Sequence, residues 1–209
     1  RDRSPSRGLG DVYKRQVGHY TDSDASTNQT ACLAGTYQPN TGQNSCLDTG
    51  VGYYTDSDAS TNQTACLTGT YNPGTVSNSS SDCVNADPGY YVEFNASTSQ
   101  IPCSEGTYQN NYSEIICIST DIGYYADGEA NIEQISCPPF NSTIGLKSTS
   151  EDCIVDSDND MIVDINDEDD DNDGISDEID EFPFDVYEWE DTDNDGIGNN
   201  ADEDDDNDG

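Results

Sequence analysis

The chain has 209 residues, of which 44 are acidic and six are Lys or Arg, so its formal net charge is −38. A charge of this sign and size repels nucleic acids and anionic membrane surfaces, and it excludes both as partners. Hydrophobic residues make up only 31% of the chain, whereas an ordinary domain has roughly 45–50% apolar residues, so a large apolar core is also excluded. No apolar run approaches the roughly 20 residues that cross a bilayer, and no transmembrane segment is predicted in this stretch.

The first 16 residues differ from the rest because they carry five of the six basic residues. They end in DVYKRQ, which is the in-frame translation of a sequence that resembles a transposon end used in sequencing libraries. We therefore interpret residues 1–16 as translated adapter and exclude them from fold and function. We expect the native start of the protein to be missing, and its native end as well, because the last acidic motif is cut at Gly209.

Residues 17–155 consist of four repeats, at 17–50, 51–87, 88–121 and 122–155. The first two begin with VGHYTDSDASTNQTACLAGTY and VGYYTDSDASTNQTACLTGTY, and the other two are looser copies. Glycine before paired tyrosines, with Asn, Ser, Thr and Asp between them, favours short strands joined by turns and shows no helical periodicity. Each repeat is therefore predicted to form a small, irregular, disulfide-rich β-hairpin module, and the modules to stack in an elongated array.

The eight cysteines favour disulfides over a zinc site. Zinc needs close cysteine pairs or histidines, whereas the nearest cysteines here are 14 residues apart and His19 is the only histidine. One pairing would join Cys46–Cys66, Cys83–Cys103 and Cys117–Cys137 and leave Cys153 over. The other joins Cys32–Cys46, Cys66–Cys83, Cys103–Cys117 and Cys137–Cys153; it is preferred because no cysteine is left. Disulfides at this density indicate an oxidising compartment.

The C-x2-G-T-Y…C pattern resembles the cysteine-rich modules of ephrin receptors and tumour-necrosis-factor receptors over residues 17–155. The resemblance implies an extracellular stalk-like array, without implying kinase signalling or a particular ligand. The same region contains N-x-[ST] sequons that predict a surface glycoprotein. They lie at Asn28, Asn62, Asn78, Asn95, Asn111 and Asn141.

Residues 156–209 hold 26 of the 44 acids and repeat the pattern D-x-D-x-D-G-x-x-[DN]-x-x-D. Calcium takes about six to eight oxygens, and a loop of this pattern offers side chains at positions 1, 3, 5, 9 and 12 with the carbonyl of position 7. Magnesium is disfavoured because it prefers water-rich octahedral sites. The predicted calcium ligands are Asp156, Asp158, Asp160, Ile162, Asp164 and Asp167; Asp169, Asp171, Asp173, Ile175, Asp177 and Asp180; Asp191, Asp193, Asp195, Ile197, Asn199 and Asp202; and Asp204, Asp206 and Asp208 of a truncated fourth copy. In the first loop Met161 replaces the glycine of position 6, where a side chain resists positive φ.

This motif is not an EF-hand. A step of 13 residues within the first pair of loops and within the last pair leaves no room for flanking helices, and Pro183 interrupts the longer spacer between the pairs. It resembles thrombospondin type-3 repeats over residues 156–209, which implies a chain that wraps a row of calcium ions with almost no core. The spacer EFPFDVYEWE is predicted to form a small apolar plug from Phe182, Phe184, Tyr187 and Trp189. Without metal, the crowded carboxylates are expected to leave this region disordered.

Neither a desolvated acid–base pair nor a free thiol is expected, so the chain is not predicted to be an enzyme. The sequence predicts part of an extracellular or cell-surface structural protein that binds Ca²⁺ and acts as a stalk. The alternative is an adhesive or receptor-like module that recognises a protein or a glycan.

Overall fold

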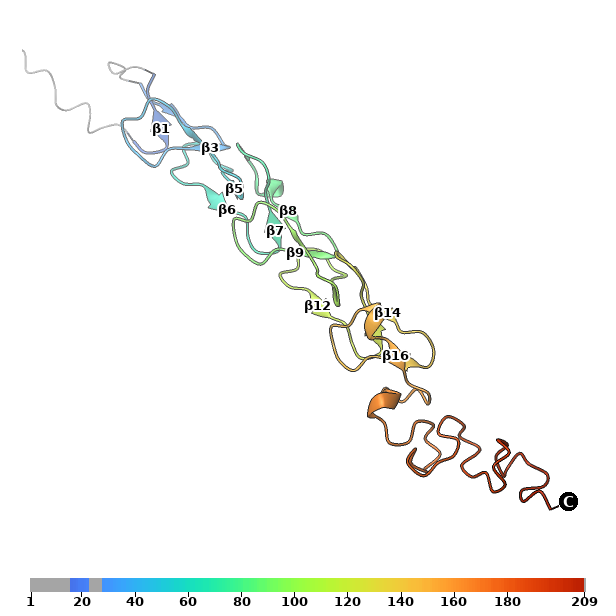
Figure 1. Cartoon of the computed structure of the whole chain (residues 1–209). Coiled ribbons are helices and arrows are strands. Elements are labelled where there is room, and N and C mark those ends of the chain that lie inside the picture. The colour runs from blue at the N-terminus through green and yellow to red at the C-terminus, as the bar shows by residue number, and fades with distance from the viewer. Residues whose placement is uncertain (1–15, 23–27, 209) are drawn as a thin grey trace, which may run out of the picture. The chain divides into compact units, whose positions relative to one another are not determined.

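The computed structural model describes residues 16–22 and 28–208 (Figure 1). All but one of the residues interpreted as adapter lie outside the described residues. The described parts contain short antiparallel hairpins whose strands are two residues long, three turns of 3-10 helix, and no α-helix. This confirms the predicted fold class of small disulfide-rich hairpin modules in an array, with little regular secondary structure.

Each hairpin pairs two strands that are neighbours in the chain. The pairs are β1 (His19–Tyr20) with β2 (Thr30–Ala31), β3 (Thr36–Tyr37) with β4 (Leu47–Asp48), β5 (Tyr53–Tyr54) with β6 (Thr64–Ala65), β7 (Thr70–Tyr71) with β8 (Val84–Asn85), β9 (Tyr90–Tyr91) with β10 (Ile101–Pro102), β11 (Thr107–Tyr108) with β12 (Ile118–Ser119), β13 (Tyr124–Tyr125) with β14 (Ile135–Ser136), and β15 (Asn141–Ser142) with β16 (Ile154–Val155). The 3-10 turns are η2 (Ser80–Asp82), η3 (Ser150–Asp152) and η4 (Asp164–Asn166).

Each sequence repeat forms two hairpins rather than the single hairpin module expected. The G-Y-Y segment supplies the first strand of one hairpin, such as β5, and the G-T-Y segment supplies the first strand of the next, such as β7. Both segments place a glycine at positive φ just before the strand, as at Gly52 (φ 82°) and Gly69 (φ 79°). The structural repeat is therefore half as long as the repeat seen in the sequence.

Backbone contacts join successive hairpins through these glycines. The amide of Gly18 donates to the carbonyl of Gln38 at 2.7 Å, and that of Gly52 to Asn72 at 2.8 Å, each in the following hairpin. A Cβ added at Gly52 would overlap the carbonyl oxygen of Ala96, which lies two hairpins along the chain. Glycine is required at this position both by its φ and by this close approach.

Polar side chains occupy most of the small interior. Asn72 is 2% exposed, and its amide nitrogen donates to the carbonyl of Tyr53 at 3.0 Å and to the hydroxyl of Ser77 at 2.8 Å. Thr55 is also buried, and its hydroxyl accepts the amide of Gly35 at 2.7 Å. At these positions the interior is held by hydrogen bonds rather than filled by apolar side chains.

The disulfides join each G-Y-Y hairpin to the G-T-Y hairpin that follows it. They link Cys32 to Cys46, Cys66 to Cys83 and Cys137 to Cys153, with Cα–Cα distances of 5.7, 5.6 and 5.7 Å. Cys103 and Cys117 are disulfide-bonded as well. Three bonds thus follow the preferred alternation, and the alternative links between repeats are not formed by these six cysteines.

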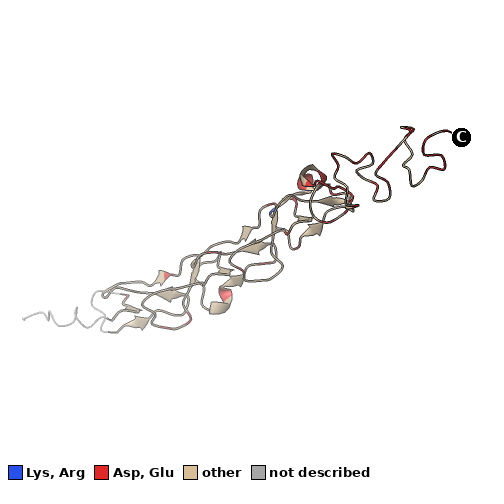
Figure 2. Cartoon of the chain, turned by 90° about the horizontal axis from the view of Figure 1, so that it is seen from below, with Lys and Arg blue, Asp and Glu red and all other residues tan. Residues whose placement is uncertain are grey.

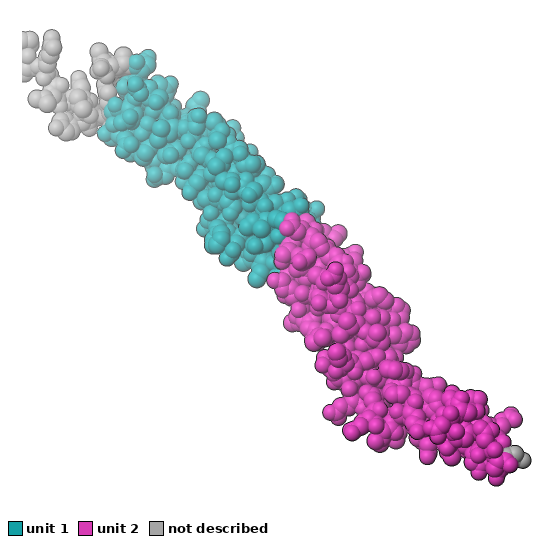
Figure 3. Space-filling model, viewed as in Figure 1, with its two compact units in different colours: residues 1–102, 111–117 teal, residues 103–110, 118–209 magenta. Residues whose placement is uncertain are grey.

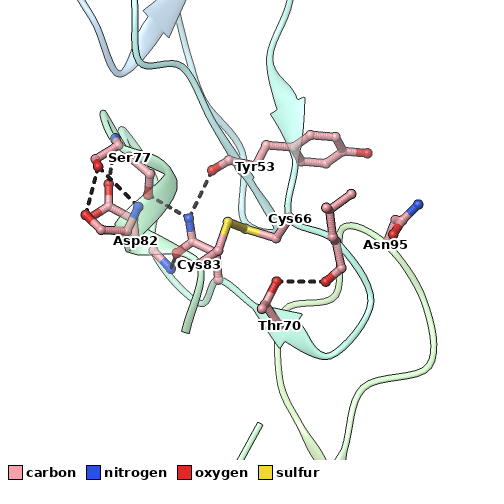
Figure 4. The surroundings of a disulfide bond; sticks show 12 residues. Tyr53, Cys66, Thr70, Ser77, Asp82, Cys83 and Asn95 are labelled. Carbon is pink, nitrogen blue, oxygen red and sulfur yellow. Dashed lines mark hydrogen bonds between the residues drawn. A yellow bond between two sulfur atoms is a disulfide. The ribbon is translucent and has the colours of Figure 1, made fainter. Parts of the chain in front are cut away.

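A capped 3-10 turn precedes the second cysteine in the two longest cysteine loops. Figure 4 shows η2 beside the Cys66–Cys83 disulfide, and the carboxylate of Asp82 accepts the amides of Asn78 and Ser79, which directly precede the turn. Asp152 accepts the amide of Thr149 at 2.7 Å in the corresponding turn η3. The cysteine separations are 17 and 16 residues in these loops against 14 for Cys32–Cys46, so the turn takes up the additional chain.

The described chain divides into two compact units (Figure 3). The first comprises residues 1–102 and 111–117, and the second comprises residues 103–110 and 118–209. The second unit contains the last hairpins and the whole acidic region. No helix in the described part of the chain is long and apolar enough to cross a membrane.

Candidate metal-binding loops

The acidic residues are concentrated in the segment that follows β16 (Figure 2). The structure brings the carboxylates of positions 1, 3 and 5 together in every copy of the motif, with one oxygen from each lying within 4.8 Å of the others. These clusters are Asp156, Asp158 and Asp160; Asp169, Asp171 and Asp173; Asp191, Asp193 and Asp195; and Asp204, Asp206 and Asp208. Residues separated by two positions converge because the backbone curls around them instead of extending.

Backbone amides of the same loop produce this curl. In the second loop the amide of Gly174, at position 6, donates to Asp169 at 3.0 Å. The amide of Asp173 donates to Asp171 at 3.1 Å, and that of Ile175 to Asp173 at 2.7 Å. The first and third loops repeat all three bonds with similar lengths. Each cluster carboxylate in these loops therefore has its direction set by a backbone donor.

Position 6 needs a positive φ in all three complete loops. Gly174 and Gly196 have φ of 96° and 90°, and Met161 has φ of 80° at the same position. The first loop thus adopts the common conformation although its residue carries a side chain, which costs about 1–3 kcal/mol. The Met161 side chain is 65% exposed, so packing does not offset this cost.

The second oxygen of several cluster carboxylates is buried and has no hydrogen-bond donor. In the second loop, Asp169 accepts an amide through Oδ2 and Asp171 through Oδ1, whereas Oδ1 of Asp169 and Oδ2 of Asp171 are buried without a partner. Asp156, which is 1% exposed, and Asp173 show the same division between their two oxygens. Buried anionic oxygens without donors are costly unless a cation neutralises them, so the donor set fits a hard divalent cation.

The predicted ligands at position 9 are used to close the loops. Asp164 accepts the amide of Ser157 at 2.8 Å, Asp177 accepts that of Asp170 at 3.0 Å, and Asn199 accepts that of Thr192 at 2.9 Å. These residues do not belong to the carboxylate clusters. The side chain at position 9 therefore fixes the backbone at position 2 of the same loop.

The predicted ligands at position 12 form hydrogen bonds with the segment that follows each loop. Asp167, Asp180 and Asp202 each accept, through Oδ1, the amide of the residue two positions later. Oδ2 of Asp180 is buried without a donor, as in the clusters. Burial raises the pKa of Asp171, and the negative charges of Asp173, Asp180 and Asp169 raise it further. The charge of Asp180 thus acts on Asp171, although Asp180 is not a member of the cluster. The carbonyls predicted at position 7 belong to Ile162, Ile175 and Ile197, whose amides anchor position 5.

Asparagine side chains connect the loops in tandem pairs. Asn172, at position 4 of the second loop, donates to Asp158 of the first loop. Asn207, at position 4 of the fourth loop, donates to Asp193 of the third. Both asparagines have positive φ, which turns their amides back toward the preceding loop. Position 4 is Asn in all four copies of the motif, and this regularity was the sequence signal for the contact.

The spacer does not form the predicted apolar plug. Phe184, Tyr187 and Trp189 are 66%, 75% and 43% exposed, Phe182 is only half-buried, and the buried residue is Glu188. The carboxylate of Glu188 accepts the amide of Asn200 at 2.9 Å and lies against Gly198, where a Cβ would overlap it. The spacer is tied to the third loop by carboxylate–amide bonds, so its aromatic rings are not needed for packing.

The hairpins and disulfides define a cysteine-rich β module, and comparison with known families agrees. Residues 18–66 match the family model described as tyrosine-protein kinase ephrin type A/B receptor-like. The match covers the first hairpins and the Cys32–Cys46 disulfide. No curated protein matches the chain. Together, the match and the disulfides indicate an extracellular structural or receptor-like module, of a kind that is not catalytic in this region.

Proposed function

We propose that the chain is part of an extracellular or cell-surface structural protein in which disulfide-linked hairpins continue into calcium-binding loops similar to thrombospondin type-3 repeats. On this proposal the four repeats of residues 17–155 form a stalk and residues 156–209 form the metal-binding region. The observation that carries it is the second loop, where Asp169, Asp171 and Asp173 converge and each keeps a buried oxygen without a donor.

Two sets of groups in the chain would hold a bound ion: the carboxylates that contact it and the backbone amides that orient those carboxylates. The cluster carboxylates supply the oxygens, and the amides at positions 5, 6 and 7 hold those oxygens in place. A bound calcium ion supplies positive charge that removes the repulsion between them. Because Lys147 is the only Lys or Arg after residue 16 and the only histidine is His19, no side chain in the acidic region can supply that charge instead.

The donor set favours calcium over magnesium. Each loop offers several carboxylates on a flexible backbone, which suits the large and adaptable shell of calcium, whereas magnesium keeps several of its waters in a near-ideal octahedron. Extracellular calcium modules bind with a dissociation constant of about 10⁻⁴–10⁻³ M. Such sites fill outside the cell and empty inside it, in agreement with the oxidising compartment that the disulfides require. We assign the chain no enzymatic activity.

Isothermal titration calorimetry of the intact chain tests the proposal. We expect calcium to bind with a dissociation constant in that range and magnesium to bind at least tenfold more weakly. Asp171→Asn should weaken the binding, whereas Asp185→Asn, in the spacer and outside every cluster, should leave it unchanged. The proposal fails if calcium produces no saturable heat, or if both variants behave alike.

A second candidate, an adhesive or receptor-like module, is favoured by exposed aliphatic side chains that pair with tyrosines on the hairpins. A tyrosine lies opposite an aliphatic residue in several of them, as in Tyr71–Val84 and Tyr108–Ile118. The tyrosines are half-buried, and Val84 and Ile118 are 44% and 42% exposed. If these exposed side chains bind a protein or glycan, Val84→Ser and Ile118→Ser should each weaken binding to immobilised matrix proteins or glycans without changing calcium binding. Equal binding by the wild type and the variants would exclude Val84 and Ile118 as contacts for such a partner.

A further inference from the structure

Each G-T-Y hairpin is closed by one backbone hydrogen bond that leads back to the residue before its first strand. The donor is the amide of the third residue after the second cysteine, and the acceptor is the carbonyl of the glycine or, in the last hairpin, of Phe140. These bonds are 2.9–3.1 Å long, and the donor residues are at most 1% exposed. We call the donors the closing residues; they are Thr49, Ala86, Thr120 and Asp156. Asp156 is therefore both the closing residue of the hairpin β15–β16 and position 1 of the first acidic loop.

In the first three repeats the closing residue also binds the G-T-Y hairpin of the next repeat. The carbonyl of Thr49 accepts the amide of Val76 at 3.1 Å, and the closing residue of the second repeat makes the same bond. The carbonyl of Thr120 accepts the amide of Lys147 at 3.3 Å, and its hydroxyl accepts the amide of Ser148 at 2.8 Å. The closing residue is thus the point at which one repeat binds the next, and it is uncharged in all three repeats.

The last repeat is followed by the first acidic loop instead of another hairpin. Oδ2 of Asp156 accepts the amide of Met161 in that loop at 3.2 Å, whereas Oδ1 is buried without a donor. Val163 of the same loop is 2% exposed, and it is the only buried aliphatic side chain in the described part of the acidic region. At the same motif position the other complete loops have Ser176 and Gly198. The first loop therefore follows the closing residue as the next hairpin does elsewhere, and it alone buries an aliphatic side chain.

A carboxylate at a closing position destabilises the hairpin unless a cation neutralises it. The unpaired oxygen of Asp156 is shielded from water, and the acidic region contains no Lys, Arg or His. Asp156 converges with Asp158 and Asp160, so an ion held by this cluster would neutralise the closing residue of the last hairpin. Because the carboxylate and the amide belong to one residue, an ion that fixes the side chain of Asp156 also favours its backbone bond to Phe140.

We propose that the first acidic loop caps the hairpin repeats through Asp156, and that calcium bound in this loop stabilises the hairpin β15–β16. This inference rests on the proposed function, because the ion is the one assigned to Asp156, Asp158 and Asp160. It goes further by giving that ion a second role, the role that a terminal unit has in stacked repeats, where it covers the last repeat. Asp169 occupies position 1 of the second loop but follows no hairpin, so the coupling is specific to the first loop.

Hydrogen exchange of the hairpin β15–β16 in the intact chain, followed by mass spectrometry with calcium and with chelator, tests the cap. In the wild type we expect calcium to slow the exchange of the amides in this hairpin by about tenfold or more. Asp156→Thr removes the ligand but supplies the residue type that closes two earlier hairpins, so this hairpin should form and no longer respond to calcium. Asp169→Thr is the matched control, since it removes position 1 of the second loop and should leave the response of β15–β16 intact.

The possible outcomes separate this inference from the proposed function. A wild-type chain that binds no calcium contradicts the proposed function. A wild-type chain that binds calcium, with unchanged exchange of β15–β16, contradicts only the cap. Equal calcium responses of this hairpin in the two variants also contradict the cap, because the response would then come from the acidic region as a whole. A response in the wild type and in Asp169→Thr, together with none in Asp156→Thr, supports it.

Discussion

The hairpin region and the acidic region lack an apolar core for the same reason, their composition, but they differ in what replaces it. Between residues 17 and 155 the buried side chains are mainly Thr, Ser, Asn, Gln and cystine, and among the described residues there only the hydroxyl of Ser142 is buried without a hydrogen-bond partner. After residue 155 the buried side chains include Asp156, Asp170, Asp171 and Asp180, each with an oxygen that has no donor. The hairpin region thus pairs nearly all of its buried polar groups by itself, whereas the acidic region has the donor pattern of a protein that needs a ligand.

Charge density explains the difference. Residues 17–155 carry 16 acidic residues, whereas the much shorter segment 156–209 carries 26. Where charge is sparse, covalent bonds and backbone hydrogen bonds can order short strands. Where it is dense, repulsion between carboxylates opposes any compact state until a cation enters. Reduction of the disulfides should therefore unfold the hairpin region, whereas removal of calcium should unfold the acidic region.

Reduction of the disulfides should have the largest effect, and mainly on the hairpins. Loss of a native disulfide from a small domain costs about 2–5 kcal/mol, which is a large share of the stability of such short strands. Circular dichroism and limited proteolysis should show the hairpin region unfolding under a phosphine reductant. Calcium binding by residues 156–209 should persist, because that segment contains no cysteine. Hairpins that resist proteolysis after full reduction would contradict the comparison.

Gly52→Ala should destabilise the hairpin region by at least about 2 kcal/mol, because alanine at a φ of 82° is strained and its Cβ would overlap the carbonyl of Ala96. Gly145→Ala is the matched control, since an added Cβ meets nothing within 4 Å there. Thermal unfolding in the presence of calcium measures both. Equal melting temperatures for the two variants would mean that the stacking of hairpins does not depend on the glycine contact.

Acid should favour order in the metal-free acidic region and leave the hairpins unchanged. The pKa of Asp170 is raised to about 6 by burial and then by its neighbours Asp177, Asp164, Asp167 and Asp158, whereas an unfolded chain has about 3.9. A raised carboxyl pKa adds stability below the unfolded value, and this stability is lost as pH rises toward 6. In chelator, circular dichroism should therefore show more structure at pH 4 than at pH 7. The opposite trend would contradict the assignment of Asp170 as buried.

Met161→Gly should have the smallest effect, a gain of about 1 kcal/mol in the first loop, because it relieves the positive φ. Calcium affinity of that loop should rise about fivefold, since 1.4 kcal/mol corresponds to about tenfold. The converse change, Gly174→Ala, should weaken the second loop, although an added Cβ there meets no neighbouring atom. Titrations that leave both affinities unchanged would show that position 6 does not limit binding.

The sequence predicted the features that depend on spacing. The regular cysteines indicated the alternation seen in the disulfides, and the D-x-D-x-D spacing indicated which carboxylates converge. It predicted one hairpin per repeat because the G-T-Y segment was not recognised as a second copy of G-Y-Y. The G-T-Y segment of the fourth repeat is hardest to recognise, because Phe140 replaces its glycine while keeping a positive φ of 59°.

The features that the sequence did not predict depend on contacts between segments. The burial of Glu188 and the exposure of the spacer aromatics follow from hydrogen bonds to the third loop. Asp170 looked like one more acid at a variable position, and only its burial distinguishes it from Asp205. A comparison of position 2 with position 9 in each loop was the one available signal, since only the second loop places Asp at both.

Hydrogen exchange of the intact chain, followed by mass spectrometry with calcium and with chelator, tests the central claim most directly. We predict that calcium protects the amides of residues 156–208, including those of Gly174 and Gly196 that donate to cluster carboxylates. Chelator should remove this protection while the hairpin amides of Gly35 and Cys66 exchange as before. Equal protection of residues 156–208 in both conditions would contradict the proposal that calcium orders this region.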